Sequence, residues 1–322
     1  MKKLLSILLV MIFVFTLSGC AKKTDPTTVT VACMTGPTGV GMAKLWADAD
    51  ADKTDNNYEI NVYGAASDFT GKFLNGEINI ASVPTNVAAT LYNKSEGKVK
   101  MLAVNTYGVL SILEKGDSIK SVEDLRGKTI YSTGEGQNPE YILKYILTEN
   151  GIDPTNDVTI KFVSSDELVS TVLTQPEVEV ALVPEPAATT ILTKNDAFKR
   201  ALSINDEWSK VSETQLMMGC VIALDSYVEE NSEAVEKFLK EYEASIKFAT
   251  ENIDDTATYC EKYGITTSAA IAKKAIPTCN LCFITENEMK TNVNGYFTVL
   301  FNANPKSIGG KMPADDFYYN AE

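Results

Sequence analysis

Cysteine is the residue type here with the most reactive side chain, and its spacing limits the chemistry available. Cys279 and Cys282 form a single Cys-x-x-Cys pair in a chain that has no histidine. Without a second such pair or a histidine, the sequence argues against a zinc or other metal site. A redox role would need the pair between a strand and a helix of thioredoxin type, which the flanking pattern does not predict. We therefore expect small buried thiols or one structural disulfide, with any pairing left open, among Cys33, Cys220, Cys260, Cys279 and Cys282.

The missing histidine also excludes Ser-His and Cys-His catalytic arrangements and removes the commonest general base. Arginine is almost as scarce, since Arg126 and Arg200 are the only two. Forked recognition of a carboxylate or phosphate can therefore occur in at most two places. Each arginine precedes an expected strand, at the end away from ligands in an α/β sheet. We therefore expect no guanidinium clamp on an anionic ligand.

The first residues of the chain have the pattern of a secretory signal. Lys2 and Lys3 precede an apolar run over 4–16, and small residues lead to Cys20. This run is shorter than the roughly 20 residues that span a bilayer as a helix. The Leu-Ser-Gly-Cys motif ending at Cys20 resembles the lipobox of bacterial lipoproteins, which implies cleavage before Cys20 and lipidation of its thiol. The alternatives are a plain signal peptide or an uncleaved anchor. We expect an extracytoplasmic protein, lipid-anchored to the cell membrane.

Charge and length narrow the class of protein further. The chain carries 43 acidic and 29 basic residues, with a formal net charge of −14. Nucleic acid is a poor partner for such a chain, because binding it requires basic residues that replace counterions. The surplus acid indicates a self-repelling, soluble surface. A length of 322 residues suits one large or two medium domains.

Strand and helix patterns alternate along most of the chain and divide it into two similar halves. Expected strands lie at 29–32, 58–63, 78–83, 100–104, 109–113, 128–131, 158–163, 178–183, 201–204 and 216–224. Expected helices lie between them at 41–49, 67–74, 84–93, 139–149, 167–174 and 185–193, and the tail adds helices at 232–250, 255–263, 267–275 and 286–301. This alternation predicts an α/β fold with mostly parallel sheets flanked by helices. We expect the tail to pack on the first half.

Two segments carry a resemblance to the extracytoplasmic substrate-binding proteins of ABC importers. Segment 76–86 (GEINIASVPTN) is similar to the family's strand-then-helix element G-x-x-D-I-A, with Asn79 where aspartate is common. Segment 119–130 (IKSVEDLRGKTI) is similar to the element I-x-S-x-x-D-L-K-G-K-x-I, which leads into the second lobe. The branch that the whole mature chain resembles includes binders of sulfonates, taurine, nitrate and thiamine-pyrimidine precursors.

The resemblance implies a two-lobed, periplasmic-binding-protein-like (type II) fold with two hinge crossings and a ligand in the cleft. Residues 1–19 would be the signal peptide, 20–27 a lipidated tether, 28–105 and 218–322 lobe one, and 106–217 lobe two. It implies a binding component that captures a solute and delivers it to an ABC permease and its ATPase, without enzymatic activity or a cofactor. We expect a monomer. The alternative class is a ligand-binding sensor lipoprotein.

Loops that follow the strands supply the candidate ligand-binding residues, because ligands of parallel α/β sheets bind at the carboxyl ends of strands. The glycine-rich loops over 35–39 and 133–138 are favoured, since they occupy equivalent places in the two halves. Some hydroxyl groups, such as those of Ser67, Thr85 and Ser165, could instead only cap helices. The candidates are Thr35, Gly36, Thr38, Gly39, Ser67, Thr85, Asn86, Asn105, Tyr107, Thr133, Gly134, Glu135, Gln137, Asn138, Ser165 and Glu185.

Two of these candidates, Glu135 and Glu185, suggest the ligand's polarity. A carboxylate suits a ligand with N–H donors or a positive charge, and Tyr107 or Tyr63 could offer a stacking face. We therefore expect a nitrogen-bearing heteroaromatic ligand of pyrimidine type. The alternative is an aliphatic sulfonate or similar anion, which helix N-termini and hydroxyl groups could hold without arginine.

Overall fold

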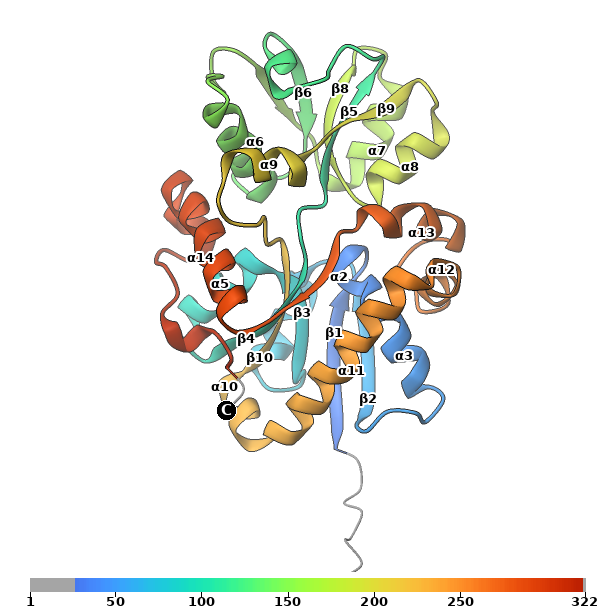
Figure 1. Ribbon diagram of the computed structural model, residues 1–322, viewed down its shortest axis with the longest axis vertical. Coiled ribbons are helices and arrows are strands. Elements are labelled where there is room, and N and C mark those ends of the chain that lie inside the picture. Colours follow the sequence, from blue (N-terminus) through green and yellow to red (C-terminus); the bar gives the residue numbers. More distant parts are fainter. Residues whose placement is uncertain (1–26, 321–322) are drawn as a thin grey trace, which may run out of the picture.

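Two α/β lobes, one above the other, form the part of the chain that the computed structural model describes, residues 27–320 (Figure 1). The expected signal peptide (1–19), the expected lipidation site at Cys20 and all but the last residue of the expected tether lie outside these residues. No helix within 27–320 is both long and apolar enough to cross a membrane.

The first lobe is built on a six-stranded mixed sheet with the order β11-β4-β10-β3-β1-β2. β1 lies parallel to β2 and β3, while β10 lies between β3 and β4 and is antiparallel to both. β11 adds an antiparallel edge beside β4, which the sequence pattern did not predict. The bounds are β1 (Thr28–Met34), β2 (Asn57–Tyr63), β3 (Ile80–Pro84), β4 (Val99–Thr106), β10 (Gly219–Leu224) and β11 (Leu281–Ile284).

A five-stranded sheet with the order β7-β6-β8-β5-β9 forms the second lobe. β6 is parallel to β7 and β8, and β5 is antiparallel to β8 and β9. The chain crosses between the sheets twice, so the predicted two-lobed architecture with two crossings is confirmed. The prediction of mostly parallel sheets is wrong, because β5, β10 and β11 pair antiparallel with their neighbours. The bounds are β5 (Leu110–Lys115), β6 (Thr129–Ser132), β7 (Thr159–Phe162), β8 (Val180–Pro184) and β9 (Phe198–Ser203).

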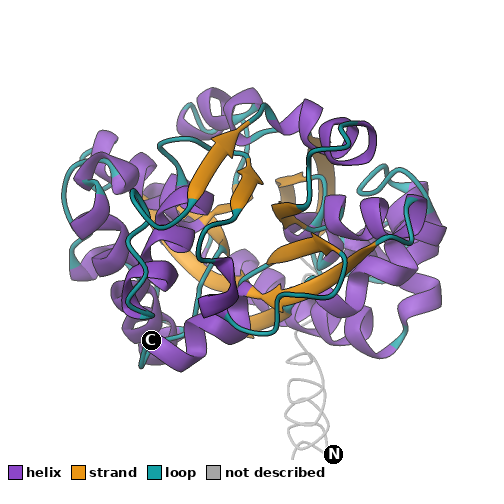
Figure 2. Cartoon of the chain, turned by 90° about the horizontal axis from the view of Figure 1, so that it is seen from above, coloured by secondary structure: helices purple, strands orange, loops and turns teal. Residues whose placement is uncertain are grey.

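Helices flank both sheets, as Figure 2 shows. Most expected helices are present, whereas the short helices α2, α9 and α10 were not predicted. In the first lobe the helices are α2 (Pro37–Val40), α3 (Ala43–Ala49), η1 (Ala66–Asp68), α4 (Thr70–Leu74) and α5 (Thr85–Lys94). In the second they are η2 (Val122–Leu125), α6 (Asn138–Glu149), α7 (Ser165–Thr174), α8 (Ala187–Lys194) and α9 (Ile204–Val211). The tail comprises α10 (Asp225–Glu230), α11 (Ser232–Glu251), α12 (Ile253–Lys262), α13 (Ala269–Ala275), η3 (Ile276–Thr278), α14 (Glu286–Ala303), η4 (Pro305–Ile308) and η5 (Asp315–Phe317).

The tail packs on the first lobe as expected, but two of its helices also reach the second lobe. α11 buries Val235, Phe238 and Tyr242, which are spaced three or four residues apart and form one apolar helix face. α13 contacts α8, and α14 contacts α6, so these two tail helices bridge the lobes (Figure 1). Burial of this face anchors the tail, while the bridging helices join the lobes on two sides.

Cysteine plays a packing role in the described part of the chain. All five cysteines within 27–320 are buried and free, which confirms small buried thiols rather than a disulfide. Burial raises the pKa of Cys33 and of Cys260 to about 12, and it also raises the pKa of Cys279 and of Cys282. No cluster of potential metal ligands occurs in these residues either. The thiols therefore stay protonated and unreactive at neutral pH.

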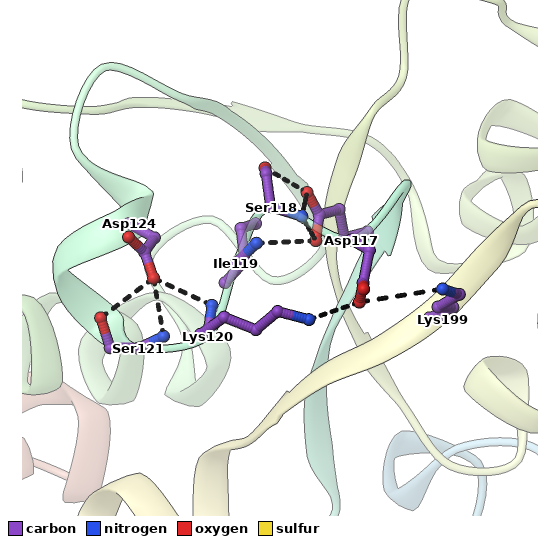
Figure 3. Close-up of polar contacts among 8 residues, drawn as sticks. Asp117, Ser118, Ile119, Lys120, Ser121, Asp124 and Lys199 are labelled. Atoms are coloured by element: carbon purple, nitrogen blue, oxygen red, sulfur yellow. Dashed lines mark hydrogen bonds and ion pairs between the residues drawn. The ribbon is translucent and has the colours of Figure 1, made fainter.

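Two carboxylates, one on the strand before it and one within it, hold together the segment 119–130 that resembles the lead into a second lobe (Figure 3). Glu114, at the end of β5, accepts hydrogen bonds from the backbone N–H groups of Ser118 and Ile119 at 2.8 and 2.9 Å. Asp124 accepts from the N–H groups of Lys120 and Ser121, both at 2.9 Å. The motif therefore folds the turn between β5 and β6, and its role is structural.

Replacing Glu114 with glutamine is expected to destabilise the protein by about 1–3 kcal/mol, because an amide NH₂ would then face the N–H donors. Burial alone would raise the pKa of Glu114, but hydrogen bonds from Ser118 and Ile119 and the nearby Lys128 lower it overall. A carboxyl group whose pKa is lower in the folded state stabilises the fold at pH values above its unfolded-state pKa. This stabilisation is lost as the pH falls through the folded-state pKa.

Urea unfolding at pH 7 and at pH 4 would measure this contribution, and the difference between E114Q and the unmutated protein should shrink at the lower pH. Glu123, an exposed carboxylate paired with Arg126, supplies the matched control, and E123Q should change stability little. Equal losses of unfolding free energy in E114Q and E123Q would show that the buried hydrogen bonds of Glu114 stabilise the protein no more than the exposed ion pair of Glu123 does.

Candidate functional site

A cavity of about 310 Å³ lies between the lobes and takes residues from both of them and from the crossings. Its size suits a small organic molecule. Polar groups in its wall are amides and hydroxyls, and the remaining surface is mostly apolar. The lining residues are Met34, Thr35, Pro37, Thr38, Pro84, Asn86, Val87, Thr106, Val109, Gln137, Asn138, Pro139, Pro184, Met218 and Gly219.

The turn after β1 positions the first part of this wall. Gly36 has a φ of 84°, a left-handed conformation that favours glycine, and Pro37 starts α2 directly after it. A Cβ on Gly39 would stand 2.3 Å from the carbonyl oxygen of Met34, so this glycine lets α2 pack against the end of β1. Thr35 and Thr38 reach the cavity from this compact turn.

Five of the predicted site residues line the cavity: Thr35, Thr38, Asn86, Gln137 and Asn138. They belong to the segments that directly follow β1, β3 and β6, with Thr38, Asn86 and Asn138 in the first turns of α2, α5 and α6. Two of these segments are the glycine-rich loops that the sequence favoured. Gly36 and Gly39 are not in the wall, but they shape the turn that carries the two threonines. Their part in the site is therefore to position other residues.

Several other candidates are engaged inside the protein. Thr85 donates its hydroxyl to the Met217 carbonyl at 2.7 Å. Asn105 donates to the Ser82 hydroxyl at 2.7 Å and to the Tyr242 hydroxyl at 2.9 Å, and it is buried. These side chains join lobe one to its crossings, and neither lines the cavity.

The remaining candidates also lie outside the cavity wall. Ser67, Glu135 and Ser165 are exposed, and Tyr107 is half-buried. Thr133 is buried next to the turn where Gly134 adopts a φ of 75°. Tyr63, the other tyrosine considered for stacking, packs against Phe69. The structure therefore brings no aromatic ring to the wall of this cavity, as far as the described residues go.

Glu185 is fully buried, and its charge is already compensated. Its carboxylate forms an ion pair with Arg200, accepts from the Thr278 hydroxyl at 2.8 Å and accepts from the Thr189 N–H at 3.2 Å. Arg200 lies within β9 and not before a strand, contrary to the expectation from the sequence. The pairing removes the reason for expecting a positively charged or N–H-rich ligand at Glu185.

A pair of amides meets across the cleft at the cavity wall. The Asn138 Nδ2 group of α6 donates to Asn86 Oδ1 of α5 at 2.8 Å. Asn138 is 7% exposed, and its Oδ1 atom has no hydrogen-bond partner among the residues described. The oxygen and nitrogen of each amide can exchange places by a flip, so the pair can present either an acceptor or a donor to a ligand.

Sequence reasoning missed most of the apolar wall. Pro84 and Pro184 occupy equivalent positions at the ends of β3 and β8, and Met218 lies where the chain returns to the first sheet. The sequence offered one signal for these two prolines, which is their position next to predicted polar candidates: Pro84 immediately precedes Thr85, and Pro184 immediately precedes Glu185. An apolar wall with a few amide and hydroxyl groups can hold a ligand that has an apolar body and one polar end.

Two lobes joined by two crossings, with a mostly apolar cavity between them, define a solute-binding protein of the periplasmic type. The family model for the phosphonate periplasmic substrate-binding proteins of ABC transporters matches residues 47–274. The chain belongs to this family. Its members serve transport as substrate-binding components, outside the cytoplasm. A search of curated proteins found no match to the sequence.

Solved structures show the same fold at low sequence identity. An ABC transporter protein from Parabacteroides distasonis is 21% identical, with a TM-score of 0.76, and the match covers 92% of this chain and 100% of that one. The periplasmic aliphatic sulphonate-binding protein SsuA from Escherichia coli is 14% identical, with a TM-score of 0.73 and coverage of 92% and 94%. The nitrate-binding protein NrtA from Synechocystis PCC 6803 is 14% identical, with a TM-score of 0.59 and coverage of 88% and 84%.

Proposed function

We propose that this protein is the solute-binding component of an ABC import system and that it captures a small organosulfonate between its lobes. The observation that carries the proposal is the chemistry of the cavity wall. It holds no charged side chain in the described residues, and it combines an apolar surface with amides and hydroxyls. Such a wall suits an apolar substituent joined to a weakly basic, singly charged head group.

Helix N-termini can supply the positive potential that an anion needs. The first residues of α5 and α6 line the cavity, and the first N–H groups of a helix have no acceptor within it. The first turn of α5 carries no acidic residue. Glu140 lies in the first turn of α6, but its carboxylate accepts from the Gly136 N–H and pairs with Lys144. The buried amide of Asn138, flipped to present Nδ2, would add a donor beside these N-termini.

The charge of the head group separates the ligand classes. A sulfonate carries one negative charge at neutral pH, whereas a phosphonate approaches two, and burial of a second charge without a cation is costly. The protein from Escherichia coli that binds aliphatic sulphonates shares this fold, which also supports a sulfonate as the ligand. A pyrimidine-type ligand loses its support, because Glu185 is paired and Glu135 is exposed away from the wall.

Import by this protein would consist of capture, closure and delivery, without any bond made or broken. A ligand that contacts both lobes shifts the population toward the closed form, which the permease then recognises. In this proposal lobe one comprises residues 28–105 and 218–322, lobe two comprises 106–217, and the protein acts as a monomer. A separate ATPase would supply the energy. Lipid on Cys20 would hold the protein at the outer face of the cell membrane, and mass spectrometry of the N-terminal peptide would test for it.

Titration calorimetry of the purified mature chain is expected to show binding of alkanesulfonates such as ethanesulfonate and butanesulfonate. Matched alkylphosphonates should bind at least about tenfold more weakly at pH 8, because a second buried charge has no cation to pair with. Pyrimidines and alkylamines should show no heat of binding. Binding of pyrimidines or amines in preference to sulfonates would refute the proposed ligand class.

A further inference from the structure

A polar contact joins the lobes outside the cavity, on the side where α13 lies below α8 (Figure 1). Glu185 follows β8 in the second lobe, and its carboxylate forms an ion pair with Arg200 of β9. Thr278 belongs to η3 in the first lobe, and its hydroxyl donates to Glu185 Oε1 at 2.8 Å. The Glu185 side chain has 0% exposure, so this contact is shielded from water.

Close packing accompanies the hydrogen bond. A Cβ on Gly36 of the first lobe would lie 3.3 Å from Pro186 Cδ and 3.8 Å from the Glu185 carbonyl oxygen of the second lobe. The Lys274 ammonium donates to the Thr193 hydroxyl at 3.4 Å at the exposed rim of the same interface. These contacts join residues of different lobes, so they exist only while the lobes are together.

The contact can break without leaving a buried charge unpaired. Glu185 keeps Arg200, which is on its own lobe, and it keeps the Thr189 N–H. The Thr278 hydroxyl has a second acceptor within reach, the Ala275 carbonyl of its own lobe at 3.0 Å. One hydroxyl proton serves one strong bond at a time, so Thr278 can exchange Glu185 for Ala275 when the lobes separate. Such a contact favours closure modestly and reversibly.

We propose that Thr278, Glu185 and Arg200 form a clasp that sets the closed population and hence the affinity for every ligand, without touching any ligand. The apparent dissociation constant equals the intrinsic constant divided by the fraction of binding-competent molecules. Loss of the clasp therefore multiplies the dissociation constants of all ligands by one common factor. The clasp rests on the proposed function only for the choice of ligand probes.

The test uses the mature chain with Thr278 replaced by valine, which keeps the shape and removes the hydroxyl. T278V is expected to weaken binding of ethanesulfonate and of butanesulfonate by the same factor, about three- to tenfold. Its radius of gyration in ligand-free X-ray scattering is expected to exceed that of the unmutated protein. T278S retains the hydroxyl and should restore both quantities. Thr190 donates to the Pro186 carbonyl within the second lobe, so T190V is the matched control and should change neither.

Unequal factors for the two sulfonates would overturn the clasp, because they would place Thr278 in contact with ligand. Unchanged affinity together with an unchanged radius of gyration would also overturn it. If neither sulfonate binds the unmutated protein while T278V still expands the ligand-free molecule, the proposed function fails and the clasp stands.

Discussion

Replacing Asn138 with aspartate is expected to weaken sulfonate binding by about 100-fold or more. The side chain is 7% exposed in the cavity wall, so its new charge would act on a bound anion with little screening. Two like charges about 4 Å apart repel by about 4 kcal/mol at the effective dielectric constant of such sites. Asn86 can flip and donate to the new carboxylate, and an acidic residue in the first turn of α6 favours the helix. The variant should therefore fold and still fail to bind.

Titration calorimetry with butanesulfonate measures this loss, and thermal unfolding checks the fold. Asn195 is the matched control, because its Oδ1 accepts from the Ala197 N–H and it lies in the same lobe outside the cavity wall. N195D makes the same charge change and should bind as the unmutated protein does. If N138D instead gained affinity for an amine or a pyrimidine, the polarity that we assign to the ligand would be reversed.

Replacing Gly39 with alanine is expected to cost about 3 kcal/mol of stability and to weaken ligand binding at least about tenfold. The added Cβ would stand 2.3 Å from the Met34 carbonyl oxygen and 3.1 Å from Ile265 Cγ2. A backbone oxygen at the end of β1 cannot move aside as a flexible side chain can. α2 must therefore shift, and Thr35 and Thr38 must shift with it out of the cavity wall.

Urea unfolding and calorimetry on the same preparation would separate the two effects of G39A. Gly71 provides the control, because it lies in α4 and a Cβ there would meet nothing within 4 Å. G71A should stabilise the protein by about 0.5–1 kcal/mol, since alanine is the better helix former. A G39A variant with the stability and affinity of the unmutated protein would mean that the turn after β1 adapts freely.

The strands and helices of regular length were predictable because their apolar residues repeat with clear periods. β11 has four residues and α9 has eight, lengths at which a periodic pattern finds some elements, such as β6 and α8, and misses others. The position of β10 between β3 and β4 was also beyond local reasoning. Periodicity shows that a strand exists, whereas its neighbours depend on which edge of the sheet is free when it pairs.

Loops of the binding site were found through their place after strands, and five of the sixteen candidate residues reach the cavity. The error over Glu185 has a clear physical origin. A carboxylate in a loop has the same sequence signature whether it faces a ligand or an arginine. Its partner Arg200 follows 15 positions later, and its other partner, Thr278, lies 93 positions away. Neither spacing corresponds to a local motif.

The sequence by itself determined the α/β architecture in two halves, the absence of histidine chemistry and the loops from which a ligand site would be built. Composition and periodicity are local properties, so they can be taken from the chain directly. Only the tertiary structure decided which polar groups remain available to a ligand. The Asn86–Asn138 amide pair lines the cavity, whereas Glu185 is neutralised between the lobes. That difference arises because a polar group is unavailable to a ligand once folding brings another partner within hydrogen-bond distance. Those partners are distant in the chain.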